Sequence, residues 1–241
     1  MSIPRFYVAN PLAVGIVSLP EDAAHHAARV LRLAEGDAIV LFNGEGGEYY
    51  GSITHIGKRD VTVQLDRFEE SDCESPLDIT LVQAVTSGER MDYAIQKAVE
   101  LGVSRIVPLI TERTTVKLKG ERANKRLAHW KKVAVSACEQ CGRNRVPEVS
   151  ALTSLTEVFS EQKGAAVWML HPLNAQPIKQ QTMPDKGLTI IIGPEGGFSD
   201  AELQMARNHH CVTISLGPRI LRMETAGPAV LAVLQSLWGD F

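Results

Sequence analysis

Short runs of apolar residues, separated by turn residues, characterise roughly the first 68 positions of the chain. Strand-like patterns occur at residues 6–8, 37–42, 49–56 and 61–65, and Gly or Asn residues separate them. The segment 20–32 reads as a helix, because its first turn is acidic and its last turn is basic. Four short strands and one helix predict a small β-barrel for this part of the chain.

The pattern changes after residues 69–76, a polar and acidic stretch that ends in proline and is typical of a linker. Strand-like and helical segments alternate beyond it. The strands are expected at 77–85, 106–110, 165–170, 188–192 and 211–216, and the helices at 90–101, 121–141 and after residues 199 and 226. Alternation of this kind favours a largely parallel sheet. We therefore predict two domains, 1–72 and 73–241, the second of the α/β class.

Two Gly-Pro loops follow buried strands in the C-terminal half. The first has the sequence Gly-Pro-Glu-Gly-Gly at 193–197, and Ser199 and Glu202 after it have the spacing of a helix capping box. The second begins at Gly217 and leads into the last helix, where we expect Pro228 in the first turn. We expect both loops at the same end of adjacent strands, where they would enclose a pocket.

The chemistry of the first loop favours a cationic or neutral ligand. Its spacing matches neither a P-loop nor the dinucleotide signature, because Pro194 and Glu195 occupy places where backbone amides would meet phosphate. A carboxylate repels phosphate but suits S-adenosylmethionine, which carries a sulfonium and an ammonium group. From spacing alone, two ordinary strand-to-helix turns explain the loops equally well. The strand at 165–170 should end at the same sheet edge, so that His171 either lines the pocket or acts as a general base.

Composition excludes several other classes of protein. No apolar run reaches the ~18 residues of a membrane span, and the N-terminus lacks a signal-peptide pattern, so a cytoplasmic protein is expected. Cys138 and Cys141 form one C-x-x-C pair without the second pair that zinc needs, so no metal is predicted. The net charge of −3 argues against nucleic-acid binding, although a local basic face remains compatible with it.

Two C-terminal motifs carry a family resemblance. Ile-Gly-Pro-Glu-Gly-Gly-Phe-Ser at 192–199 and Leu-Gly-Pro-Arg-Ile-Leu-Arg-Met-Glu-Thr-Ala at 216–226 resemble the SPOUT class of knotted methyltransferases, and more closely the bacterial 16S ribosomal RNA uridine-N3 methyltransferases. The likeness extends over essentially the whole chain, including Arg5, 29–32, 96–103 and 138–145. It implies an α/β domain with a trefoil knot, an N-terminal PUA-like β-barrel and a homodimer in which the last helix takes part.

The resemblance also implies a function and a set of site residues. The function is methylation of uracil N3 in 16S ribosomal RNA of the small subunit, at uridine 1498, with S-adenosylmethionine as methyl donor. The expected cofactor-binding residues are Leu170, His171, Gly193, Pro194, Glu195, Gly196, Gly197, Leu216, Gly217, Ile220, Leu221, Arg222, Glu224 and Thr225. The expected RNA-binding residues are Arg5, Arg29, Arg32, Arg143, Asn144 and Arg145.

Chemical reasoning adds a catalytic hypothesis. Uracil N3 carries a proton with a pKa above 7, so the enzyme must stabilise the anion that forms when the proton leaves. We hypothesise that Arg222 supplies the positive charge, with Glu195 or Glu224 positioning it.

Other interpretations remain open at this stage. Helix-dipole matching explains Arg29 and Arg32 without RNA, and a solvated loop explains Arg143 to Arg145. A non-catalytic RNA-binding or ribosome-assembly module, whose α/β half only dimerises, is the competing function; it would not bind S-adenosylmethionine. An unknotted Rossmann-type methyltransferase is disfavoured, because no glycine-rich turn follows the strand at 77–85.

Overall fold

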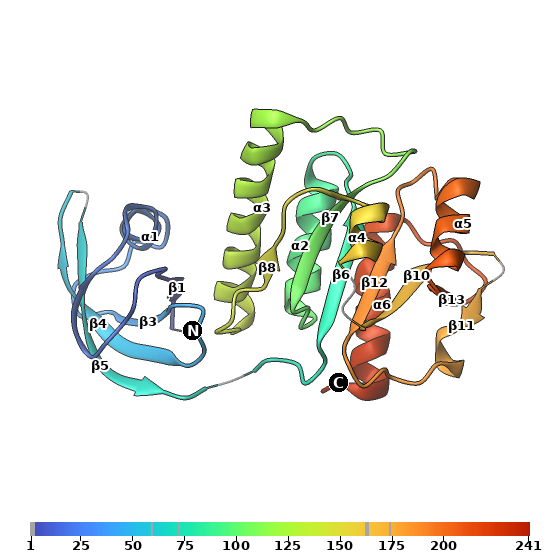
Figure 1. Ribbon diagram of the computed structural model, residues 1–241. Helices are drawn as coiled ribbons and strands as arrows, with labels where there is room; N and C mark the ends of the chain where they lie inside the picture. The colour runs from blue at the N-terminus through green and yellow to red at the C-terminus, as the bar shows by residue number, and fades with distance from the viewer. Residues whose placement is uncertain (1–2, 59, 72, 162–163, 174) are drawn as a thin grey trace. The chain divides into compact units, whose positions relative to one another are not determined.

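The computed structural model describes residues 3–58, 60–71, 73–161, 164–173 and 175–241 (Figure 1). Met1 and Ser2 of the expected leaderless N-terminus, and Asp72 at the predicted domain boundary, lie outside these residues. The chain divides into two compact units, Met1–Glu74 with Val135–Val146, and Ser75–Ala134 with Pro147–Phe241. The boundary at residue 72 stays a prediction. No helix in the described ranges is long and apolar enough to cross a membrane.

The N-terminal unit contains one five-stranded sheet. Its strands follow the order β1 (Arg5–Tyr7), β3 (Ala38–Phe42), β4 (Glu48–Ile56), β5 (Val61–Glu69) and β2 (Gly15–Ser18). β1 pairs with β3 in parallel, and the other pairs are antiparallel. The sheet encloses a core that includes Phe6, Ile39, Leu41, Val63 and Leu65. β2 was not predicted, because its residues alternate only between exposed and half-buried positions.

The predicted helix at 20–32 is shorter than expected. α1 (Glu21–His25) continues as the π-helical turn η1 (His26–Val30), in which the Leu31 amide donates to the His26 carbonyl. Arg32 then adopts a left-handed backbone conformation with φ of 56°. The expectation that Arg29 and Arg32 project from one side of a helix end is therefore wrong, because the regular helical repeat ends before Arg32.

A buried polar network joins the last residues of α3 (Gly120–Cys141) and the loop after them to the strands of this unit. The Arg5 guanidinium forms a salt bridge with Glu48 and donates to Asn144 Oδ1 at 2.6 Å. The Tyr7 amide donates to Glu139 Oε1 at 3.0 Å. These hydrogen bonds and the salt bridge tie residues 139–144 to β1 and β4 within the N-terminal unit, although Arg5 Nε itself is buried without a partner.

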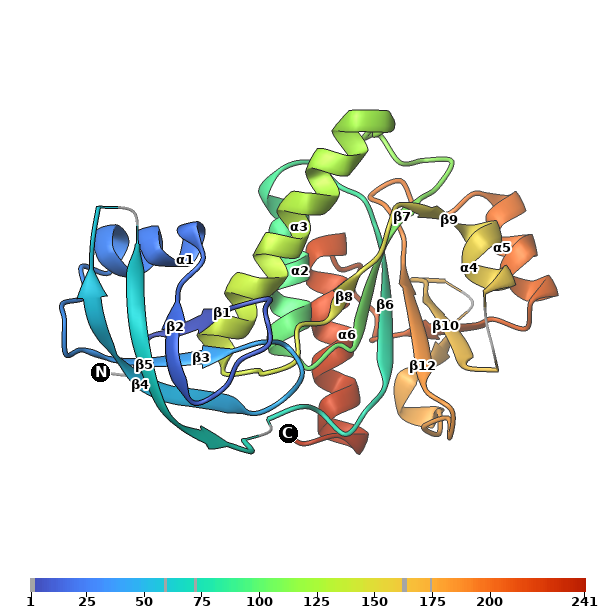
Figure 2. The same cartoon turned by 60° about the vertical axis from the view of Figure 1, so that its left-hand side comes forward.

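The C-terminal unit is a three-layer α/β structure around a parallel sheet (Figure 2). The strand order is β11 (Gln176–Pro177), β13 (Val212–Ser215), β10 (Ala166–Leu170), β12 (Leu188–Ile192), β6 (Ile79–Ala84), β7 (Arg105–Ile110) and β8 (Glu148–Val149), and β9 (Thr153–Ser154) pairs with β7. Helices α4 (Leu155–Ser160) and α5 (Asp200–Asn208) cover one face, and α2 (Glu89–Glu100) and α6 (Met223–Trp238) cover the other. A 3-10 turn, η2, spans Ile178–Gln180. The predicted parallel α/β organisation is confirmed.

Two local expectations for this unit are wrong. The strands that precede the two Gly-Pro loops, β12 and β13, are not adjacent, because each pairs with β10, which lies between them. Pro228 is not in the first turn of α6, since the helix begins at Met223 and the proline lies inside it. A proline at this position has no N–H for the carbonyl of Glu224, so the helix lacks one internal hydrogen bond there.

The Arg5–Glu48 pair generates a prediction about stability. Replacing Glu48, whose side chain is 7% exposed, with Ala leaves the Arg5 charge buried without its carboxylate partner. We expect Glu48→Ala to lower the free energy of unfolding by about 3 kcal/mol in urea titrations. The exposed Glu70 is a matched control, and Glu70→Ala should change the free energy by less than about 0.5 kcal/mol. Equal effects of both variants would contradict this prediction.

The same pair predicts a dependence on pH. Burial raises the pKa of Glu48, but hydrogen bonds from Tyr50 and Arg5 outweigh it, so the pKa lies below its ordinary value. A lowered carboxyl pKa stabilises the fold above the pKa of the unfolded chain, and this contribution disappears as the pH falls through the folded pKa. Urea titrations on the acid side should therefore show a weaker pH dependence for Glu48→Ala than for the wild type.

Candidate functional site

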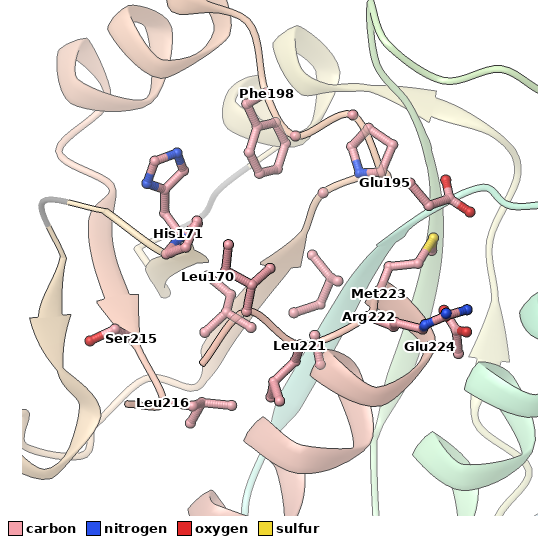
Figure 3. Close-up of a pocket in the computed structure, with 18 of the residues that line it drawn as sticks. Leu170, His171, Glu195, Phe198, Ser215, Leu216, Leu221, Arg222, Met223 and Glu224 are labelled. Carbon is pink, nitrogen blue, oxygen red and sulfur yellow. The ribbon is translucent and has the colours of Figure 1, made fainter. Parts of the chain in front are cut away.

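The loops that follow β10, β12 and β13 enclose a cavity of about 530 Å³ together with the start of α6 (Figure 3). The three strands are parallel, so the loops leave the sheet at the same edge. The cavity lies entirely within the C-terminal unit, and its volume is typical of sites for small molecules and cofactors, about 300–1,000 Å³. The predicted pocket at this edge of the sheet is present.

The sequence of the glycine loop explains its tight course. A Cβ at Gly193 would lie 2.7 Å from the ring of Phe198, which is buried, and Gly197 has φ of +67°. The predicted capping box is confirmed: the Ser199 hydroxyl accepts from the Glu202 amide, and the Glu202 carboxylate accepts from the Ser199 amide. Glu202 also accepts from the Glu112 amide at 3.0 Å, which ties the loop after β7 to α5.

The Glu195 carboxylate already has partners in the loop after β6 and in α2. Its Oε1 accepts from Thr86 Oγ1 at 2.8 Å and from Arg90 Nη1 at 2.8 Å. The loop is therefore less acidic than the sequence suggests, because Arg90 balances the charge of Glu195. In this structure Glu195 contacts Arg90 rather than Arg222, and positioning of Arg222 by Glu195 or Glu224 stays a prediction.

A second arginine that sequence reasoning missed binds the backbone of the same loop. Arg113 Nη1 donates to the Gly196 carbonyl at 2.9 Å, and a Cβ at Gly196 would lie 3.2 Å from Arg113 Cβ. Arg90 and Arg113 both line the cavity. They follow β6 and β7, so the rule that sites form beyond the carboxyl ends of parallel strands could have found them, had it been applied to every strand.

The lining divides into an apolar side and a charged side. Figure 3 shows Leu170, Leu216 and Leu221 on one side, and Glu195, Arg222 and Glu224 on the other. Four arginines line the cavity as a whole, at positions 90, 113, 219 and 222, against these two glutamates. The pocket therefore offers an apolar surface to one part of a ligand and a surplus of positive charge to another.

The expected cofactor-binding residues line this cavity with one exception. Thr225 is absent from the lining, because it is exposed in the first turn of α6. His171 lines the cavity, which is one of its two predicted roles. Its Nδ1 lies 2.7 Å from the Leu173 carbonyl of its own loop. Whether these residues bind a ligand stays a prediction.

The expected RNA-binding residues fall into two groups. Arg29, Arg32 and Arg145 are exposed, and RNA contact by them stays a prediction. Arg143 and Asn144 are only 5% and 1% exposed. Both predictions for them, direct contact with phosphate and a solvated loop, are therefore wrong for these two side chains. Arg143 forms a salt bridge with Glu74, and Asn144 Nδ2 donates to the Ser71 carbonyl at 3.0 Å. Arg5 is likewise occupied by Glu48 and Asn144.

The two cysteines of the C-x-x-C pair differ in exposure, because Cys138 is buried and Cys141 is half-buried. Cys138 is buried, and burial raises the pKa of its thiol to about 12, which opposes the thiolate needed for metal binding or redox chemistry. No cluster of three or more metal-ligating side chains occurs in the part of the chain that the structure describes.

Comparison with known proteins identifies the class to which this fold and pocket belong. Residues 73–235 match the family described as an RNA methyltransferase domain, and residues 19–66 match an RNA methyltransferase PUA domain. The chain belongs to this RNA methyltransferase family, as the sequence motifs predicted, and its N-terminal unit is PUA-like.

Particular relatives are similar along their whole length. Ribosomal RNA small subunit methyltransferase E of Buchnera aphidicola is 34% identical, over 99% of this chain and 95% of the relative. The enzyme of the same name from Neisseria gonorrhoeae, solved with S-adenosylmethionine bound, is 39% identical, with a TM-score of 0.93 and complete coverage of both chains. A protein from Legionella pneumophila, also solved with this cofactor, is 39% identical, with a TM-score of 0.97 and complete coverage of both chains.

The contact between Gly193 and Phe198 generates a prediction about the loop. Gly193→Ala should destabilise the protein by about 1–3 kcal/mol, because the new methyl group overlaps the Phe198 ring. The double variant Gly193→Ala with Phe198→Leu removes that overlap. Its loss of stability in urea should be smaller than the sum of the two single losses by at least about 0.5 kcal/mol. Strictly additive losses would show that the ring does not restrict residue 193.

Proposed function

We propose that this protein methylates N3 of a uracil in 16S ribosomal RNA, at uridine 1498 as the family resemblance implies, using S-adenosylmethionine. The observation that carries the proposal is the cavity beyond three parallel strands, in a chain 39% identical over its full length to an S-adenosylmethionine-bound ribosomal RNA methyltransferase. The two-sided lining supports it, because the reaction brings together a cationic methyl donor, whose adenine ring can pack on apolar side chains, and an anionic RNA.

The residues present fit the methyl donor. When bound, S-adenosylmethionine supplies a methyl group on a positively charged sulfur, which becomes a neutral thioether after transfer. The leucines at 170, 216 and 221 offer an apolar surface to an adenine ring, and the glycine loop brings main-chain groups close to the cavity. Glu224 lines the cavity and offers a carboxylate to the cationic groups.

The remaining task of the protein is to make uracil N3 a nucleophile. N3 must lose its proton, which passes to solvent, before its electron pair can form the new bond to carbon. The resulting negative charge spreads onto the two neighbouring carbonyl oxygens, so a cation held near them accelerates the reaction. Arg222 fits this role because it is exposed at the N-cap of α6 and lines the cavity on the charged side.

The N-terminal unit is proposed to bind RNA through its exposed arginines, Arg29, Arg32 and Arg145. Arg5, Arg143 and Asn144 are proposed to support this surface from within, since their side chains bind protein groups. Family resemblance further leads us to propose a SPOUT trefoil knot, a homodimer and action on the small ribosomal subunit in the cytoplasm.

Calorimetry and product analysis test the proposed activity. Wild-type protein should bind S-adenosylmethionine in the micromolar range and convert uridine in 16S ribosomal RNA to N3-methyluridine, as measured by mass spectrometry of nucleosides. Arg222→Ala should bind the donor but lose about 100-fold in rate. Absence of binding heat in the wild type would favour a non-catalytic RNA-binding module, and unchanged turnover by Arg222→Ala would remove this arginine from catalysis.

Salt dependence tests the RNA contacts. Each lost phosphate contact should lower the slope of log affinity against log salt by about 0.7 for single-stranded RNA, so Arg29→Ala with Arg32→Ala should lower it by about 1.4. Arg207 on α5 hydrogen-bonds Gln204 within its own helix and provides the control. Arg207→Ala should leave the slope unchanged, and a double variant with the wild-type slope would exclude both arginines from the RNA interface.

A further inference from the structure

The charge of the cavity is not explained by the methyl donor. Four arginines face two glutamates in the lining. S-adenosylmethionine itself carries a net positive charge, so surplus guanidinium groups repel it rather than bind it. The surplus suits the other substrate, because RNA phosphates are anionic and uracil becomes anionic when N3 loses its proton.

Arg90 is anchored by a chain of hydrogen bonds. Its Nη1 donates to Glu195 Oε1 at 2.8 Å, and the same oxygen accepts from Thr86 Oγ1 at 2.8 Å. Thr86 is 4% exposed, so the carboxylate that holds Arg90 is itself attached to a buried group. The guanidinium is therefore fixed to the glycine loop and to the residues after β6 at the same time.

The other three arginines lack an anchor of this kind within the described ranges. Arg113 donates to a backbone carbonyl and so supports the course of the loop. Arg219 and Arg222 are exposed, and neither has a side-chain hydrogen bond or ion pair to the described residues. A side chain without a partner must be ordered as charge develops, whereas one already held in place stabilises the charge at a smaller cost.

We propose that Arg90 contacts the target uracil, hydrogen-bonding one of its carbonyl oxygens and stabilising the anion, with Glu195 and Thr86 as positioning residues. The inference rests on the proposed function. An arginine carries five N–H donors in a planar fork, and Glu195 takes a single nitrogen, so donors remain for the base. Glu195 thus has a role different from the one expected of it, since it orients Arg90 rather than Arg222.

The electron balance shows where this arginine acts. The N3 proton leaves to a water molecule, the N3 electron pair forms the bond to the methyl carbon, and the pair of the broken carbon–sulfur bond stays on sulfur. Negative charge on the uracil carbonyls is greatest after N3 has lost its proton and before N3 has formed the bond to the methyl carbon. Arg113, Arg219 and Arg222 add positive charge to the lining but are not held by a carboxylate among the described residues, and Glu224 opposes them with negative charge.

The test compares full-length wild type with Arg90→Ala, Arg90→Lys, Glu195→Ala and Glu195→Gln, and uses Arg113→Ala as the matched loop control. Three quantities are measured: calorimetric affinity for S-adenosylmethionine, the single-turnover rate of N3 methylation across neutral and alkaline pH, and ionisation of the bound base. Ionisation is followed by ¹⁹F NMR of RNA carrying 5-fluorouridine at the target, with S-adenosylhomocysteine present so that no transfer occurs.

The expected result is a loss that depends on pH. Arg90→Ala should lower the rate about 100-fold at neutral pH and much less at alkaline pH, where the base ionises unaided, and should raise the ¹⁹F titration midpoint. Affinity for the donor should change by less than about threefold, because the contact is made to the base. Arg90→Lys should be intermediate, since it keeps the charge and loses the fork. Glu195→Ala should raise the midpoint too, and Glu195→Gln, which keeps an acceptor oxygen, should restore most of it.

Two outcomes overturn the inference. A rate that falls by the same factor at every pH, with an unchanged ¹⁹F midpoint, would assign Arg90 to loop support alone. The second outcome is that Arg90→Ala weakens binding of S-adenosylmethionine as much as Arg113→Ala does, without a shift of the ¹⁹F midpoint. This result would also assign Arg90 to loop support alone. Failure of the proposed function is seen separately, because the wild type would then form no N3-methyluridine.

Discussion

Strand β10 pairs with β12 on one side and with β13 on the other, and all three run parallel, so their chains leave the sheet at one edge. Every feature of the cavity depends on this arrangement. Leu170 is distant in sequence from Leu216 and Leu221 of the loop after β13, yet all three line the same side of the pocket. Two further strands, β6 and β7, extend the sheet in the same direction and bring Arg90 and Arg113 to the glycine loop.

Much of the fold was predictable because the spacing of apolar residues along the chain indicates which positions are buried in a strand or a helix. The strands that became β3, β7, β10 and β12 are rich in buried apolar residues, and the capping box at Ser199 is a local signal that needs no tertiary information. Among the missed strands, β8, β9 and β11 are only two residues long and have no period to detect, and β2 alternates only between exposed and half-buried positions. Strand order also escaped prediction, because pairing between distant segments leaves no trace in spacing.

The pocket-lining residues were predictable and their partners were not. Motifs located the loops, but charge alone suggested an acidic loop, whereas the Glu195 carboxylate is balanced by Arg90 from another element. The same limit applies to the arginine-rich segment 143–145. A sequence shows that guanidinium groups are present, but burial and a nearby carboxylate, Glu74, decide whether they face solvent or support the fold.

The N-terminal unit is interrupted in sequence, and this has a consequence for how the chain folds as it is made. Glu74 accepts from the Arg145 amide, which is synthesised 71 residues later. Arg5 donates to Asn144, which is synthesised 139 residues after it. The segment synthesised first therefore cannot complete its interior until more than half of the protein has been translated. The N-terminal unit can therefore close only after residues 75–134 of the other unit have been made, which departs from the usual order in which an N-terminal domain folds before its successor appears.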